Sequence, residues 1–105
     1  MYLARIPFRQ SVDVRPWVVI GDPVPDPSSP ERVLVTLAPV SSQCDLQPLE
    51  HFPIDASSPD FGATGLRRSS YVVPYPVRVS AERLERKIGE LTGAMLAEFR
   101  DWCGD

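Results

Sequence analysis

Residues 15–20 read R-P-W-V-V-I, and residues 32–39 read R-V-L-V-T-L-A-P. Both stretches are rich in β-branched and aromatic side chains, which favour strands over helices. The run from Pro16 to Ile20 contains no polar side chain, and such a run predicts a strand buried on both faces. A further strand is predicted over 32–39. We therefore expect the fold to be built on a β-sheet.

Prolines surround these two stretches. The chain has 12 prolines among its 105 residues, about twice the usual share of ~5%, and all of them lie within residues 1–76. Because proline lacks an N–H donor, it belongs at strand ends, sheet edges and turns. The pattern predicts strands over 2–8, 51–55 and 71–79, an end to the second strand at Gly21-Asp22-Pro23, and loops over 24–30 and 57–65.

The C-terminal part of the chain, residues 77–105, contains no proline. Leu96, Phe99 and Trp102 follow helical spacing, Thr92 is a suitable N-cap, and Gly104 stands where helices commonly end. These signals predict a helix over 93–103, whereas the pattern over 86–91 fits either a helix or a strand. Short strands followed by one terminal helix indicate a single α+β domain over residues 1–105, a small half-open barrel with the helix beside it.

Charge is unevenly distributed along the chain. The net charge is −3, yet residues 61–80 contain three arginines and no acid, while residues 81–105 contain six acids and four bases. A chain of this kind does not coat nucleic acid indiscriminately, because the acidic part repels phosphates. A local arginine face is nevertheless able to bind a few phosphates.

Several classes of protein are not supported by the sequence. The longest apolar run, Trp17 to Ile20, is far shorter than the ~20 residues of a membrane helix. No secretion signal stands at the N-terminus, which leads us to expect a cytoplasmic protein. Cys44 and Cys103 form no C-x-x-C pair, and His51 is the only histidine, so neither a metal site nor another cofactor is predicted. Reduced thiols are the favoured state of the two cysteines, with one disulfide left open.

Polar residues flank two of the predicted strands. Arg15 directly precedes Pro16, whose ring biases the residue before it towards an extended conformation. The sequence S-S-Q at 41–43 follows the strand over 32–39. Residues of these types are also common in loops. A hydrolase triad is not predicted, because His51 has no identifiable partner and is more simply a structural residue.

Five segments gain meaning from their order. They read R-P-W-V-V-I at 15–20, R-V-L-V-T-L-A-P-V-S-S-Q at 32–43, F-P-I-D at 52–55, G-L-R-R-S-S-Y-V-V at 65–73 and R-L-E-R-K-I-G-E-L-T at 83–92. In this order and spacing they resemble the MazF/PemK family of toxins, which are small endoribonucleases of toxin–antitoxin systems. The resemblance implies an SH3-like β-barrel with a C-terminal helix, a homodimer, and a strand over 86–91.

The resemblance also implies a function. It implies metal-independent, sequence-selective cleavage of single-stranded RNA by attack of the RNA's own 2′-hydroxyl, and restraint by a cognate antitoxin protein. The family's catalytic arginine, in its arginine–proline pair, matches Arg15, and its catalytic hydroxyl, usually a threonine, matches Ser41. The residues that we expect to bind RNA are Ser42, Gln43, Arg67, Arg68 and Arg78.

The chain departs from the family pattern at two places. Pro76 stands where the family commonly has a glutamine, and only residues 10–14 separate the first strand from Arg15. These departures leave an alternative open, namely a non-catalytic barrel of the same fold that binds a protein target, as a gyrase poison or an inactive relative does. Tyr71 and Tyr75 are expected to pack within the protein, and stacking on bases is the alternative that stays open for them.

Overall fold

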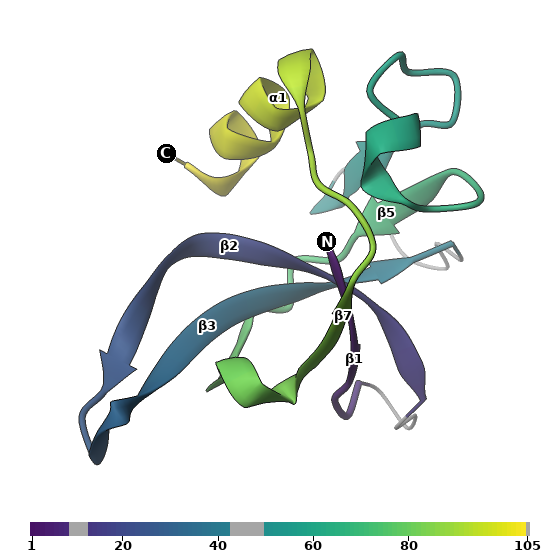
Figure 1. Ribbon diagram of the computed structural model, residues 1–105. Coiled ribbons are helices and arrows are strands. Elements are labelled where there is room, and N and C mark those ends of the chain that lie inside the picture. The colour runs from purple at the N-terminus through teal and green to yellow at the C-terminus, as the bar shows by residue number, and fades with distance from the viewer. Residues whose placement is uncertain (9–12, 43–49, 105) are drawn as a thin grey trace.

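The computed structural model describes residues 1–8, 13–42 and 50–104. Within them, seven strands form one antiparallel sheet, and one α-helix follows near the C-terminus (Figure 1). The strands are β1 (Tyr2–Arg5), β2 (Val14–Asp26), β3 (Ser29–Ser41), β4 (Phe52–Ile54), β5 (Ser70–Val72), β6 (Val77–Ser80) and β7 (Leu84–Lys87). The helix is α1 (Gly93–Cys103), and η2 (Gly62–Thr64) and η3 (Ala81–Arg83) are single 3-10 turns.

Strand β3 lies at the centre of the sheet. It pairs along one edge with β2 and along the other with β6 and then β5. The path through the sheet runs β4-β5-β3-β2-β1-β7, with β6 beside β3. Within the described residues β4 and β7 do not pair with each other, so the sheet is not closed into a barrel. The expected combination of a small β-sheet with one C-terminal helix is confirmed.

The apolar run of β2 separates two clusters of buried side chains. Trp17, which is 0% exposed, packs on one face of the sheet in a cluster that includes Leu37. Val18, which is 4% exposed, packs on the other face in the cluster that contains Phe99 of α1. The prediction of a strand buried on both faces is confirmed here, and it explains why the run is apolar at consecutive positions.

The loop predicted over 24–30 is wrong. β2 and β3 form a long hairpin that projects from the body of the molecule and turns at residues 27–28 (Figure 1). Gly21, with a φ of 70°, falls where the register shifts between Ile20 and Val24, as in a bulge. Pro23 and Pro25 lie beyond the part of β2 that pairs with β1. Among the described strands, the edge of β2 that faces β1 has no partner strand at these positions. A proline there lacks an N–H that would otherwise donate to a neighbouring strand, so no hydrogen bond of the sheet is lost.

Three other strand predictions need correction. The strand predicted over 71–79 is divided into β5 and β6, because residues 73–76 form a turn that contains Pro74 and Pro76. The strand implied over 86–91 ends at Lys87 as part of β7. The first strand is shorter than predicted, since β1 ends at Arg5.

Helix α1 has the bounds that the sequence predicts. Thr92 is its N-cap residue, and Gly104 ends it with a φ of 87°. Within the described chain, however, the Thr92 side chain makes no capping bond to the helix. Asp60 caps it instead, because its carboxylate accepts the backbone N–H of Met95 (3.3 Å) and the hydroxyl of Thr92 (3.2 Å).

Replacing Asp60 by alanine is expected to lower the free energy of unfolding by about 1 kcal/mol, the usual value of a lost N-cap. The N–H of Met95 would lose its acceptor, and the negative charge near the positive end of the helix dipole would disappear. Urea unfolding followed by circular dichroism measures the change. The control is Glu98→Ala, an exposed site on the same helix, and equal losses for the two variants would contradict the capping role.

Candidate functional site

A groove of about 760 Å³ lies where β2 and β3 stop pairing with each other. The last pair of their ladder joins Trp17 to Pro39. Beyond it, β2 runs beside β1, with Arg15 opposite Ala4, while β3 runs beside β5. The groove lies between these diverging strand ends, and Arg15 and Ser41 both line it.

The two catalytic candidates therefore come from different strands to the same groove. Arg15 and Ser41 are each half-buried. The guanidinium carbon of Arg15 lies 4.8 Å from the centre of the Phe8 ring, a cation–π contact that restricts the side chain. Ser42 also lines the groove and is exposed. Gln43 lies outside the described residues.

Two predicted arginines form one wall of the groove. Arg67 and Arg68 are exposed residues of the segment between η2 and β5, and both line the groove. This segment is held by its serines, since the hydroxyl of Ser70 donates to the carbonyl of Arg68 (2.9 Å) and that of Ser69 accepts the N–H of Ala56 (2.8 Å). Arg67 and Arg68 therefore line the same groove as Arg15.

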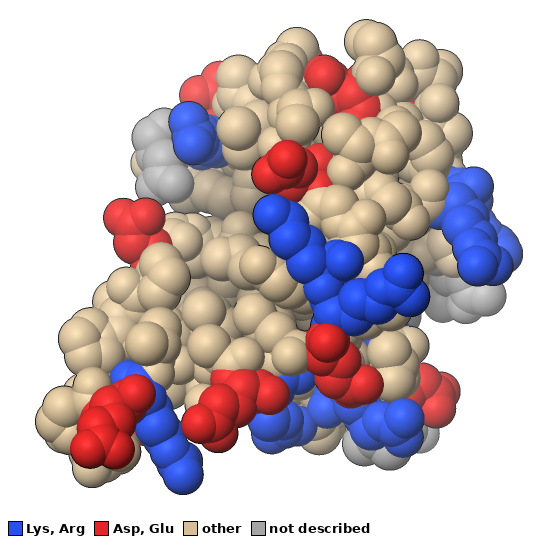
Figure 2. Space-filling view, viewed as in Figure 1, with Lys and Arg blue, Asp and Glu red and all other residues tan. Residues whose placement is uncertain are grey.

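A second part of the groove wall carries two cations that the sequence did not single out. Arg86 and Lys87 lie on β7, where they pair with Leu3 and Tyr2 of β1, and both line the groove. Figure 2 shows Lys and Arg side chains over β7 and again at the edge formed by the segment before β5. Among the described lining residues there are four arginines and one lysine and no carboxylate. The groove is therefore electropositive, which favours a ligand that carries phosphates.

Arg78 is placed elsewhere. It lies on β6 opposite Thr36 of β3 and is not among the described residues that line the groove. Its neighbours Val77 and Val79 pack with the Trp17 cluster, so Arg78 points to the other side of its strand. Thr36 belongs instead to a second, apolar groove that also contains Trp102.

Two glycines bring the basic walls together. A Cβ atom on Gly65 would lie 2.0 Å from the carbonyl oxygen of Ile88, and one on Gly89 would lie 2.3 Å from that of Ala63. The backbones are also joined by a hydrogen bond from the N–H of Glu90 to the carbonyl of Ala63 (2.8 Å). The segment that leads into Arg67 and Arg68 thus rests directly on the segment that follows β7.

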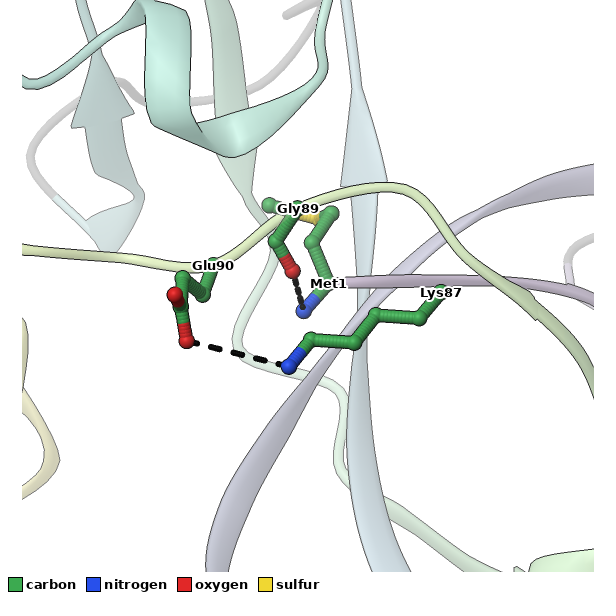
Figure 3. Close-up of polar contacts among 4 residues, drawn as sticks. All are labelled: Met1, Lys87, Gly89 and Glu90. Carbon is green, nitrogen blue, oxygen red and sulfur yellow. Dashed lines mark hydrogen bonds and ion pairs between the residues drawn. The ribbon is translucent and has the colours of Figure 1, made fainter.

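The N-terminal amine lies at the edge of this junction. The ammonium group of Met1 donates to the carbonyl of Gly89 (3.0 Å), and Lys87 lies 3.7 Å from a carboxylate oxygen of Glu90 (Figure 3). Burial lowers the pKa of the Met1 amine below 8.0, the positive charge of Lys87 lowers it further, and Glu90 opposes both effects. The charged amine is therefore less favourable in the folded chain than in the unfolded one.

This lowered pKa predicts a pH dependence of stability. Between the folded pKa and 8.0 the unfolded chain binds more protons at this amine, so its contribution to the free energy of unfolding increases as the pH rises through that interval. Replacing Lys87 by methionine removes one cause of the lowering, and we expect the pKa of Met1 to move back towards 8.0. An NMR titration of Met1 measures the shift. A further decrease in the variant would contradict the assigned cause.

Over residues 1–8, 13–42 and 50–104, His, Cys, Asp and Glu side chains form no group of three or more that suits a metal ion. No helix there is long and apolar enough to cross a membrane. No protein-family model matches the chain, and no curated protein sequence is similar to it.

Proposed function

We propose that this chain is a toxin of the MazF/PemK type, a metal-independent and sequence-selective endoribonuclease that cleaves single-stranded RNA. The observation that carries the proposal is the groove at the ends of β2 and β3. It joins Arg15 and Ser41, the two residues matched to the family's catalytic pair, with cations on both parts of its wall. A rigid guanidinium and a hydroxyl surrounded by positive charge suit a phosphodiester backbone.

The chemistry proposed for this groove uses a nucleophile that RNA supplies. The 2′-oxygen loses its proton to water and bonds to the adjacent phosphorus, and the bond from phosphorus to the 5′-oxygen breaks. A cyclic 2′,3′-phosphate and a 5′-hydroxyl result, the latter taking up a proton. Arg15 stabilises the negative charge that develops on the phosphoryl oxygens, and Ser41 donates a hydrogen bond that orients the phosphate. DNA lacks the 2′-hydroxyl and is not cleaved.

The proposal extends to the fold family and to partners. The position of β3 between β2 on one edge and β6 and β5 on the other, and the bend of the β2–β3 hairpin in Figure 1, support an SH3-like half-open barrel. A homodimer, a cognate antitoxin and a cytoplasmic location belong to the same proposal. The apolar groove that contains Ile20, Trp102 and Cys103 offers surface for a protein contact.

Incubation of the purified chain with a long single-stranded RNA in EDTA tests the proposal, with fragment ends mapped by primer extension. We expect cuts at a repeated short motif, and none in DNA of the same sequence. Intact RNA at stoichiometric protein would overturn the nuclease proposal. The alternative, a non-catalytic barrel that binds a protein target, would then be the one to pursue.

The basic walls predict a salt dependence of RNA binding. Each phosphate contact contributes about −0.7 to the slope of log K against log salt concentration for a single strand. We expect Arg86→Ala to weaken binding of a non-cleavable 2′-O-methyl RNA and to reduce the slope by about that amount. Arg100→Ala, on α1 and outside the lining residues, serves as the control. An unchanged slope for Arg86→Ala would remove β7 from the RNA surface.

A further inference from the structure

Tyr75 is a large aromatic side chain at the surface. It lies in the turn between β5 and β6 and is 65% exposed. The expectation that it packs within the protein is therefore wrong, whereas Tyr71 is half-buried and its ring meets that of His51 edge-on. A molecule that binds over Tyr75 removes the apolar area of its ring from water, which is favourable.

The ring of Tyr75 is held in place from below. It meets the Phe8 ring edge-on, with centroids 6.3 Å apart. Phe8 is 8% exposed and meets the ring of the fully buried Trp17 in the same way at 6.1 Å. The N–H of Tyr75 donates to the carbonyl of Val73 (2.7 Å), and its neighbours in sequence are both prolines, which restrict its backbone. The ring is thus a rigid platform that needs little ordering when a ligand covers it.

Tyr75 and Arg15 contact the same phenyl ring. The guanidinium carbon of Arg15 lies 4.8 Å from the centre of the Phe8 ring, and the Tyr75 ring meets the same ring edge-on with centroids 6.3 Å apart. Phe8 therefore lies against both the arginine that is proposed to bind a phosphate and the exposed tyrosine. In single-stranded RNA the base next to such a phosphate is free to leave its neighbours and stack on a protein ring.

We propose that Tyr75 is a stacking platform for one nucleobase of the single-stranded RNA whose phosphate Arg15 binds. The inference rests on the proposed function and specifies how the substrate is held. The stack uses the π-face of the base, so it tolerates any base and adds affinity rather than sequence preference. It also extends the substrate surface beyond the groove, over Phe8 to the turn between β5 and β6.

Two non-cleavable probes test this role by fluorescence anisotropy. One is a labelled 2′-O-methyl RNA 12-mer of mixed sequence, and the other is a 12-mer of the same backbone with abasic sugars. We expect Tyr75→Ala to bind the first about 5- to 150-fold more weakly than the wild type, the range for one lost stack. Its affinity for the abasic probe is expected to be unchanged, and Tyr75→Phe should bind both normally. The control is Val33→Ala, which removes another exposed apolar side chain, on the projecting hairpin.

The outcomes separate this inference from the proposed function. If the wild type cleaves natural RNA but Tyr75→Ala binds both probes normally, the stacking role fails and the nuclease proposal stands. Equal losses on the two probes, or the same loss in Val33→Ala, would also overturn stacking. Selective loss on the base-containing probe without cleavage of natural RNA would support stacking and overturn the nuclease. No binding of either probe by the wild type would overturn both.

Discussion

Replacing Arg15 by alanine is expected to lower the rate of RNA cleavage by about 10²- to 10³-fold, the usual effect of removing one donor from a transition-state charge. The side chain is half-buried in the groove and held over Phe8, so its guanidinium is positioned before a substrate binds. Arg15→Lys keeps the charge but loses the planar fork of donors, and we expect it to restore little activity. Single-turnover cleavage of a labelled RNA measures these rates.

Ser41 provides a second, independent variant of the same site. Ser41→Ala removes the hydroxyl that would orient the phosphate, whereas Ser41→Thr keeps it and adds only a methyl group. We therefore expect the alanine variant to lose activity and the threonine variant to retain it. Arg100→Ala is the matched control for loss of an arginine outside the groove. Wild-type rates for both Arg15→Ala and Ser41→Ala would place the chemistry elsewhere.

Replacing Gly89 by alanine is expected to lower the free energy of unfolding by about 3 kcal/mol or more, because an added Cβ collides with main-chain atoms. It would lie 2.3 Å from the carbonyl oxygen of Ala63 and 2.4 Å from the carbonyl carbon of Thr64. Backbone atoms cannot rotate away as a side chain does, so η2 must shift. In a domain of this size the melting temperature should decrease by roughly 12 °C or more.

Gly62 is the matched control for this substitution. A Cβ atom there meets nothing within 4 Å, so Gly62→Ala should stay within about 1 kcal/mol of the wild type. Thermal unfolding of both variants decides the comparison. Similar stabilities for Gly89→Ala and Gly62→Ala would mean that the two backbones do not touch at Gly89. The segment bearing Arg67 and Arg68 would then not be anchored beside β7.

The elements that the sequence predicted correctly are those whose signals lie in residues adjacent along the chain. The helix over 93–103 was predictable because its apolar spacing, N-cap position and terminal glycine all lie within it or beside it. The run from Pro16 to Ile20 was predictable for the same reason. The hairpin was not, because Pro23 and Pro25 indicate a loop unless one knows that β1 does not continue beside them.

The candidate site was predicted in part. The resemblance named Arg15 and Ser41, and the arginines at 67 and 68 stood out in a stretch without acids. Arg86 and Lys87 did not stand out, because they lie in an acidic part of the chain and only their pairing with β1 brings them to the groove. Arg78 stood out only because it lies in the same stretch without acids. Its neighbours Val77 and Val79 pack in the Trp17 cluster, so the side chain of Arg78 points to the other side of β6.

The sequence by itself determined the buried strand over 16–20, the helix over 93–103 and which residue types suit phosphate chemistry, because periodicity, capping and composition are properties of adjacent residues. Only the tertiary structure decided which of those residues share a surface. Asp60 caps α1 by accepting the backbone N–H of Met95, a residue 35 positions further along the chain. The backbone at Gly65 lies directly against the backbone of Ile88. Contacts of this kind depend on strand register and on how closely two backbones approach, which no local pattern encodes.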